Sequence, residues 1–115
     1  MELKSFAKTD VKISAIGLGT WGWGDWYWGY GSRYVKQDLV SALSKSLDLG
    51  VNLIDTAEAY GWGLSEKIIG EVLAGRQDEV FIVTKYLPLH IFSSSMIKAV
   101  ENSLKRLQTR TIDLY

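Results

Sequence analysis

Residues 52–73, NLIDTAEAYGWGLSEKIIGEVL, decide the fold of this chain. The stretch opens with a short apolar run that ends at a carboxylate, Asp55, and a tyrosine, Tyr60, follows in a glycine-flanked loop. A second apolar run, residues 80–83, ends just before a lysine, Lys85. The pattern predicts an acid, a phenol and an amine just beyond two strands, which is where parallel α/β proteins place their chemistry.

Strand and helix patterns alternate on both sides of this stretch. The second helix is expected to be capped by Ser65, and the serines at 93–95 offer caps for a third helix. Apolar residues of that third helix recur at three- and four-residue steps, at Ile97, Val100, Leu104 and Leu107. In chain order we expect a β-hairpin at residues 2–16, a strand at 15–18, a glycine-aromatic loop at 21–34, a helix at 37–49, a strand at 52–55, a helix at 65–73, a strand at 80–85, a helix after residue 93 and the start of a fourth strand at 111–115.

This alternation predicts an α/β fold with parallel strands and right-handed crossovers. Two architectures fit it: an open doubly wound sheet, or the start of a (β/α)8 TIM barrel. A closed barrel needs roughly 250 residues. We therefore expect residues 1–115 to be one domain, roughly the first half of a barrel, which ends within the fourth strand. The hairpin is expected to lie across the N-terminal ends of the strands.

A half barrel leaves a sheet edge and apolar strand faces uncovered. We expect inner-face residues such as Leu53, Phe81 and Val83 to be exposed for this reason. The same reasoning predicts self-association through the open barrel edges.

The composition excludes several classes of function. The hydrophobic share of 47% and the charged share of 23% fit a globular chain rather than a disordered one. Basic and acidic residues balance at 13 each, which indicates neither a nucleic-acid partner nor a membrane partner. Cysteine is absent and His90 is the single histidine, so thiolate and multi-histidine metal sites are excluded. No signal peptide or membrane-spanning run is present, which predicts a cytoplasmic location.

Residues 21–34, WGWGDWYWGYGSRY, form an unusual glycine-aromatic stretch. It can be a surface loop whose rings pack on one another, or it can be one wall of a substrate pocket. The predicted strand ends on either side of it favour the pocket.

Several motifs, in the same order, resemble the aldo-keto reductase family. KTDVKISAIGLGTWGWG is similar to the opening hairpin and first barrel strand of the family, and GVNLIDTAEAYGWGLSEKIIGEVL to its second strand, active-site loop and second helix. VFIVTKYLP resembles the third strand, and TIDLY the start of the fourth. The resemblance covers essentially the whole chain, as the N-terminal part of a longer protein. It implies a (β/α)8 barrel that reduces aldehydes and ketones with NADPH.

The resemblance implies catalytic roles for Asp55, Tyr60 and Lys85. The tyrosine would give a proton to the developing alkoxide, the lysine would ease that donation, and the aspartate would hold the lysine. The histidine that completes the family's catalytic set would follow TIDLY, and His90 does not match that position, so we interpret it as a loop histidine. By the same resemblance, the cofactor-binding residues are Gly19, Thr20, Trp21 and Asp55, and the substrate-pocket residues are Trp21, Trp23 and Tyr86.

Each of these residues also has a simpler interpretation. Asp55 can be a strand-end carboxylate that accepts backbone hydrogen bonds, Tyr60 an ordinary loop tyrosine, and Lys85 a strand-end lysine that reaches solvent. Glu66 is most simply a first-turn carboxylate that interacts with the helix dipole. Because the first three residues gather at adjacent strand ends, we favour their functional interpretation.

The leading hypothesis is an NADPH-dependent oxidoreductase that acts on a small carbonyl substrate. The 115-residue chain by itself is expected to be inactive, since it lacks the family's histidine. The alternative is a non-enzymatic family member, or a half-barrel that binds the cofactor or a partner protein.

Overall fold

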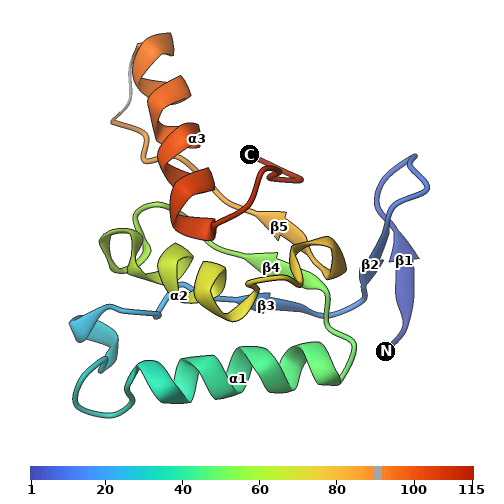
Figure 1. Cartoon of the computed structure of the whole chain (residues 1–115), viewed down its shortest axis with the longest axis horizontal. Helices are drawn as coiled ribbons and strands as arrows, with labels where there is room; N and C mark the ends of the chain where they lie inside the picture. The colour runs from blue at the N-terminus through green and yellow to red at the C-terminus, as the bar shows by residue number, and fades with distance from the viewer. Residues whose placement is uncertain (90–91) are drawn as a thin grey trace.

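A small antiparallel hairpin and a three-stranded parallel sheet make up the β-structure of the chain (Figure 1). The computed structural model describes residues 1–89 and 92–115. The hairpin pairs β1 (Leu3–Ser5) with β2 (Lys12–Ser14), and the parallel sheet has the order β3 (Gly17–Gly19), β4 (Leu53–Asp55), β5 (Phe81–Val83). The α/β class and the hairpin predicted from the sequence are confirmed.

The register of the parallel sheet aligns the last residues of its three strands. Gly19 of β3 pairs with Asp55 of β4, and Asp55 pairs in turn with Val83 of β5. Because side chains alternate between the two faces of a strand, residues at one register position point to the same face. The carboxyl ends of the strands therefore form one level edge, on which loops from each strand meet.

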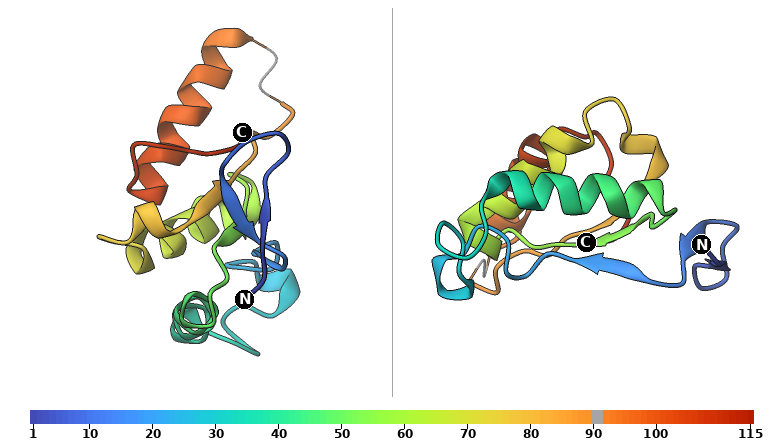
Figure 2. Two further views of the ribbon diagram at one scale, coloured as in Figure 1. Left: turned by 90° about the vertical axis from the view of Figure 1, so that its right-hand side faces the viewer. Right: turned by 90° about the horizontal axis from the view of Figure 1, so that it is seen from below.

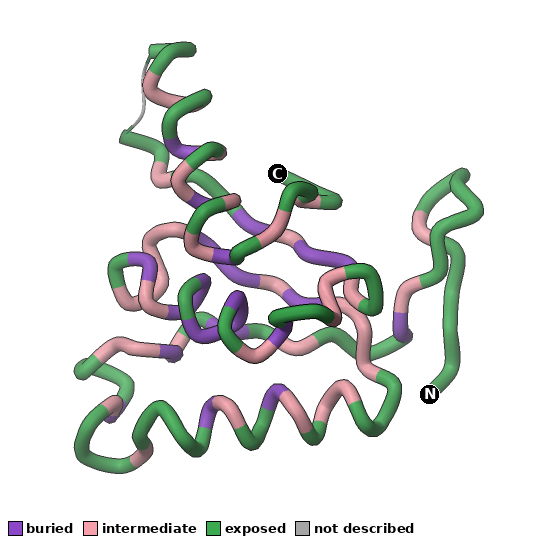
Figure 3. The backbone as a smooth tube through the Cα atoms, in the orientation of Figure 1, coloured by how far each residue is buried: buried purple, intermediate pink, exposed green. Residues whose placement is uncertain are grey.

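Three α-helices lie on one face of the parallel sheet (Figure 2). They are α1 (Lys36–Asp48), α2 (Leu64–Val72) and α3 (Ser93–Leu107), and α1 and α2 connect the consecutive parallel strands. Figure 3 shows that the buried residues concentrate between these helices and the sheet. The apolar core consists of Trp23, Leu39, Leu43, Ile54, Ile68, Ile69, Leu73, Ile82 and Leu107. Burying each leucine or isoleucine side chain contributes about 1.5–3 kcal/mol, so this layer is the main source of stability.

The hairpin lies at the N-terminal ends of the parallel strands, as predicted. The side chain of Asn52 accepts a hydrogen bond from Ser14 N at 2.6 Å and donates one to Lys12 O at 3.0 Å. The ring of Phe6 lies 4.8 Å from the ring of Phe81, centroid to centroid. Phe81 is consequently only 5% exposed, so the prediction that it would be exposed is wrong. The other two inner-face residues of that prediction, Leu53 and Val83, are half-buried.

The starts of the second and third helices differ from the prediction. Gly63, in a left-handed conformation, is the N-cap of α2, and Ser65 lies inside the helix with its hydroxyl directed to Thr20. Phe92 is the N-cap of α3 without a side-chain cap, and Ser95 Oγ donates back to Phe92 O at 2.7 Å. The serines therefore make other hydrogen bonds than the predicted caps, because a hydroxyl near a helix start has several competing partners.

The C-terminal part of the chain also departs from expectation. Residues 111–115 form only an isolated parallel bridge to β5, between Leu114 and Val83, in place of a regular fourth strand. In α3, Ile97 is 62% exposed, and the buried positions are Ala99, Ser103 and Leu107. In the described ranges, 1–89 and 92–115, no helix has both the length and the apolar character needed to cross a membrane.

Candidate active site

An ion pair joins the carboxyl ends of β4 and β5. Lys85 Nζ donates a hydrogen bond to Asp55 Oδ1 at 2.7 Å and a second one to Thr56 O at 2.8 Å. Both side chains of the pair are 46% exposed. An ion pair this exposed contributes only about 0–1 kcal/mol to stability. The pair therefore contributes little to holding the fold together.

Tyr60 lies beside this ion pair, at the start of the short turn η2 (Tyr60–Gly63). Lys85 Nζ is 5.2 Å from the centroid of the Tyr60 ring, within the range of a cation–π contact. The structure thus brings Asp55, Tyr60 and Lys85 together. The two described hydrogen bonds of Nζ go to Asp55 and Thr56, so the lysine faces the tyrosine ring without a hydrogen bond to the phenol oxygen.

The turn that carries Tyr60 has a left-handed backbone over three residues. Gly61, Trp62 and Gly63 have φ angles of 57°, 54° and 88°. A Cβ added at Gly61 would lie 2.6 Å from the carbonyl oxygen of Trp23, so only glycine fits there. Trp62 is 88% exposed and has no such steric freedom, and a bulky residue in this region is strained by roughly 1–2 kcal/mol. The turn is therefore seated tightly on the aromatic loop, with a tryptophan held out beside Tyr60.

The four residues predicted to bind the cofactor have different environments. Gly19 has open space where a side chain would point, since no atom lies within 4 Å of an added Cβ. Trp21 is 66% exposed, and the Asp55 side chain is 46% exposed at the end of β4. Thr20 is 0% exposed, so its side chain is not accessible to a bound molecule in this structure and has a structural role instead.

Thr20 belongs to a buried cluster of three hydroxyl groups. Its Oγ1 donates to Asp55 O at 3.0 Å and accepts from Ser65 Oγ at 2.8 Å. Ser65 Oγ also lies 3.0 Å from Thr56 Oγ1, and all three side chains are fully buried. The cluster joins the end of β3, the end of β4 and the first turn of α2 directly behind Asp55. Sequence reasoning missed it because the three hydroxyls come from separate segments of the chain.

The aromatic loop has tightly packed rings and also borders a cavity. Its rings pack on one another, and Trp21 and Trp28 meet edge to face with centroids 5.7 Å apart. They also line a cavity of about 400 Å³ together with Trp23, which is 8% exposed and belongs to the core. The remaining lining residues are Gly19, Gly22, Tyr34 and Leu39.

Tyr86, the third predicted pocket residue, lies elsewhere. It follows Lys85 directly and stacks on Tyr115, with centroids 6.1 Å apart and an interplanar angle of 29°. It does not line the aromatic cavity. His90, interpreted as a loop histidine, falls outside the residues that the structure describes.

A charged network that the sequence did not predict lies behind the strand ends. Glu66 is 0% exposed, and its two oxygens accept hydrogen bonds from Thr84 Oγ1 and from Arg106 Nε, each at 2.6 Å. Arg106 also approaches Glu58, at 3.8 Å, and donates to Ser103 Oγ at 3.1 Å. The interpretation of Glu66 as a helix-dipole residue is therefore incomplete: the acid is in the first turn of α2, but its partners come from β5 and α3.

A model of the aldo/keto reductase family matches residues 15–115 of this chain. The chain belongs to the aldo/keto reductase family. It is 42% identical to the aldo-keto reductase YhdN of Bacillus subtilis over 100% of the chain and 37% of YhdN. It is also 42% identical to the methylglyoxal reductase YeaE of Escherichia coli over 92% of the chain and 35% of YeaE. The chain therefore spans about a third of the length of these curated relatives.

Solved aldo-keto reductases share the fold of this family member. A thermostable aldo-keto reductase in complex with the inhibitor epalrestat superposes with a TM-score of 0.86 and 38% identity over 100% of the chain and 42% of the solved structure. An aldo/keto reductase from Klebsiella pneumoniae in complex with NADP and acetate gives a TM-score of 0.77 and 40% identity over 89% of the chain and 34% of the solved structure. These matches confirm the predicted family and the predicted hairpin followed by part of a (β/α)8 barrel.

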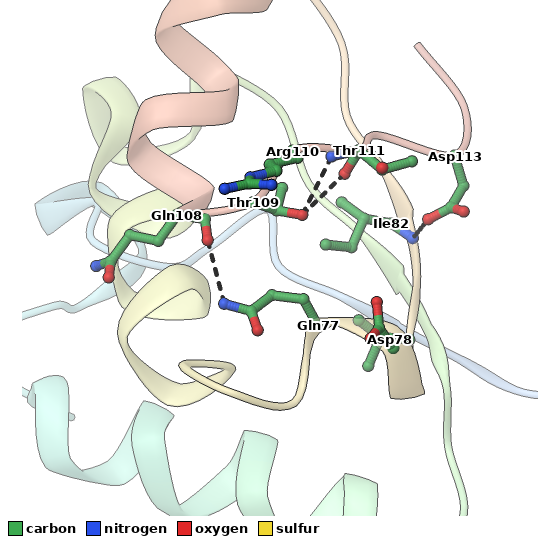
Figure 4. Close-up of a pocket in the computed structure, with 9 residues that line it drawn as sticks. Gln77, Asp78, Ile82, Gln108, Thr109, Arg110, Thr111 and Asp113 are labelled. Carbon is green, nitrogen blue, oxygen red and sulfur yellow. Dashed lines mark hydrogen bonds between the residues drawn. The ribbon is translucent and has the colours of Figure 1, made fainter.

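Another cavity of this aldo/keto reductase chain lies away from the ion pair. It has a volume of about 470 Å³ and opens between the segment around Gln77 and the segment after α3 (Figure 4). Gln77 Nε2 donates to Gln108 O at 3.1 Å across it, and Asp113 Oδ2 accepts from Ile82 N at 2.7 Å. None of the site residues predicted from the sequence lines it.

Two tyrosines have a raised pKa: Tyr34, which lines the aromatic cavity, and Tyr115, which stacks on Tyr86. Burial raises the pKa of Tyr34 above its ordinary value, and Asp25 and Tyr30 raise it further. Burial likewise raises the pKa of Tyr115, with added repulsion from Glu58 and Glu66. Tyr34 donates its phenol proton to Gly22 O, which is consistent with a neutral phenol at neutral pH.

Proposed function

We propose that this chain carries the acid–base half of an NADPH-dependent reductase site for aldehydes or ketones. The observation that carries the proposal is the meeting of Asp55, Tyr60 and Lys85 at the carboxyl ends of β4 and β5, with Lys85 Nζ bonded to Asp55 and 5.2 Å from the Tyr60 ring. Membership of the aldo/keto reductase family supports it.

In this proposal Tyr60 is the proton donor. Carbonyl reduction leaves negative charge on the substrate oxygen, and a phenol within reach can give that oxygen a proton. The resulting phenolate is stabilised by the nearby Lys85 ammonium. Asp55 holds the ammonium in place through its 2.7 Å hydrogen bond, and Thr56 O fixes it from a second direction.

The residues at the strand ends fit a nicotinamide cofactor. The open space over Gly19 admits a flat group against the backbone, and the exposed face of Trp21 lies next to it. Asp55 faces the same edge through the register Gly19–Asp55. When bound, NADPH would supply the hydride that the side chains of this chain cannot provide. Gly19, Trp21 and Asp55 are thus our candidates for contact with it, and Thr20 supports them from the interior.

The substrate would be a small carbonyl compound with an apolar or aromatic body. The cavity lined by Trp21, Trp23 and Trp28 presents mainly aromatic surface and contains no charged side chain. Tyr86 stays a candidate for the rim because it adjoins Lys85. A cytoplasmic location remains an expectation from the sequence alone.

The experiment is a carbonyl-reduction assay on a chimeric barrel. Residues 1–115 replace the matching third of YhdN, to which they are 42% identical over their full length, and NADPH oxidation is followed with a simple aromatic aldehyde. Tyr60→Phe is expected to lower kcat by about 10²–10⁴-fold, since it removes the proton donor and keeps the ring. Lys85→Met is expected to lower kcat to a similar extent, since it removes the ammonium that stabilises the phenolate of Tyr60.

Tyr27→Phe serves as the matched control, because Tyr27 is 72% exposed and lies in the aromatic loop. Its activity should equal that of the unmodified chimera. Full activity of Tyr60→Phe would refute the role of Tyr60. Cofactor binding without turnover in the unmodified chimera would favour a cofactor-binding module over an enzyme. The 115-residue chain assayed alone should show no useful turnover.

A further inference from the structure

We propose that Arg106 of α3 is a positioning residue for both Lys85 and Tyr60: it supports the Lys85 segment through the carboxylates of Glu58 and Glu66, and it contacts the Tyr60 turn with the stem of its own side chain. The inference deepens the proposed function and rests on it. Arg106 makes no described contact with the Asp55–Lys85 ion pair, and it was not among the site residues predicted from the sequence. Its contacts nevertheless reach both segments that carry the acid–base pair.

The first link is the buried carboxylate of Glu66. One oxygen accepts from Thr84 Oγ1 and the other from Arg106 Nε, each at 2.6 Å. Glu66 is fully buried, and an ionised carboxylate in such a place requires a bonded cation. Thr84 immediately precedes Lys85, so this link anchors the chain just before the lysine.

The second link is Glu58, which anchors Lys85 and the residues that follow it. Its side chain accepts a hydrogen bond from Leu87 N, and its own backbone N–H donates to Lys85 O at 3.1 Å. Arg106 Nη2 lies 3.8 Å from Glu58 Oε2. The segment 84–87 is therefore held at Thr84, Lys85 and Leu87 by two acids that share one guanidinium.

The third link runs to the turn that carries Tyr60. A Cβ added at Gly63 would lie 2.8 Å from Arg106 Cδ, so the stem of the arginine packs directly on this turn. Gly63 has a φ of 88° and is also the N-cap of α2. Arg106 thus touches the Tyr60 turn with its stem and supports the Lys85 segment with its head.

A lysine cannot do the same work as this arginine. Guanidinium is a rigid planar fork that keeps its charge at all ordinary pH values, whereas an ammonium is a single point charge. Arg106 uses separate nitrogens for Glu66 and for Ser103 and faces Glu58 as well. Without it, two neighbouring acids would repel each other behind the strand end.

The test measures local order around Lys85 in the 115-residue chain by amide hydrogen exchange. Arg106→Gln should accelerate exchange at Leu87 N–H and Glu58 N–H, the two amides of the network, by about fivefold relative to Leu43 and Ile69 in the core. Fivefold is the factor that corresponds to losing one net hydrogen bond. Equal acceleration at all four amides would show a general loss of stability and would overturn the proposal.

A second readout follows the Lys85 amine itself. Competitive acetylation compares Lys85 with Lys36, whose side chain is similarly exposed at 49% against 46%. Arg106→Gln should raise the labelling rate of Lys85 relative to Lys36 by about fivefold, since its bonds to Asp55 and Thr56 would loosen. An unchanged ratio would overturn the proposal.

Two further variants keep the test decisive if Arg106→Gln does not fold. Arg106→Lys retains the charge and should accelerate amide exchange at Leu87 by an intermediate factor. Glu58→Gln changes a less buried position and should accelerate amide exchange at Leu87 but not at Ile69. The matched control is Arg76→Gln, which removes an exposed Arg–Glu pair and should change neither readout. Turnover is not measured here, so failure of this proposal is distinguishable from failure of the role of Tyr60, which the chimera assay tests.

Discussion

Replacing Ser65 with alanine tests whether the buried hydroxyl cluster supports the strand ends. Ser65 Oγ donates to Thr20 Oγ1 at 2.8 Å and lies 3.0 Å from Thr56 Oγ1. The substitution removes both contacts. Thr20 keeps its bond to Asp55 O, whereas Thr56 Oγ1 loses its one described hydrogen-bond partner. The side chain of Thr56 is fully buried, so water cannot take the place of that partner.

The expected loss of stability is about 2 kcal/mol. The lost hydrogen bond to Thr20 removes about 0.5–1.5 kcal/mol, and the buried Thr56 hydroxyl that is left without a partner costs about 1–3 kcal/mol. Alanine has a better helix propensity than serine by roughly 0.5 kcal/mol, which offsets part of this loss. For a chain of 115 residues, 2 kcal/mol corresponds to a fall in Tm of about 8 °C.

Urea unfolding followed by tryptophan fluorescence measures the effect, with Ser41→Ala as the matched control. Ser41 is an exposed helix residue whose hydroxyl bonds only to Gln37 O, so its replacement should leave stability equal or slightly higher. Adding Thr56→Val to Ser65→Ala should recover part of the loss, because it removes the stranded hydroxyl. If Ser65→Ala unfolds at the same urea concentration as Ser41→Ala, the cluster does not stabilise the strand ends.

Three further predictions follow from the same structure. Gly70→Ala should lower the unfolding free energy by about 1–3 kcal/mol, because the new Cβ would lie 2.7 Å from the backbone carbon of Leu107. Gly19 has open space where a Cβ would point, so Gly19→Ala should leave the stability in urea unchanged but weaken NADPH binding by the chimera. Ultraviolet titration should show Tyr34 and Tyr115 ionising at a higher pH than a free tyrosine, since the pKa of each is raised. The folded state holds these protons to a higher pH than the unfolded chain, so their contribution to stability is present below about pH 10 and falls as the pH rises further. Sedimentation of the 115-residue chain should reveal association through the open sheet edges, and a single monomeric species at high concentration would contradict that expectation.

The order of elements could be predicted from the sequence because apolar periodicity is a local signal. The strand from Leu53 to Asp55 and the helix of leucines before it differ from the prediction by only one residue at their starts. Residues 111–115 were predicted as the start of a fourth strand from their apolar run, and in the structure they form one parallel bridge to β5. A strand needs partners along its length, and propensity alone does not supply them.

Asp55 and Lys85 could be placed from the sequence because they lie at or just after the ends of two strands, whereas the residues that support them could not. The partner of Glu66 is Arg106, forty positions along the chain, and no local pattern connects the two. A glutamate in a first helical turn satisfies the dipole interpretation equally well whether it is exposed or buried. In the same way, the hydroxyl of Ser65 fits a cap in the sequence and a tertiary hydrogen bond in the fold, and only packing against β3 decides between them.

These supports explain how so exposed an ion pair can keep a fixed geometry. Asp55 and Lys85 are each about half exposed, and surface side chains of this kind usually lose their order to solvent. Here the backbone beneath each one is anchored from the buried side, at Asp55 by the hydroxyl cluster and at Lys85 by the Glu58–Glu66–Arg106 network. A site held in this way is preorganised by strands and helices rather than by its own loop. It follows that substitutions in these buried supports should disturb the Asp55–Lys85 ion pair before they unfold the chain.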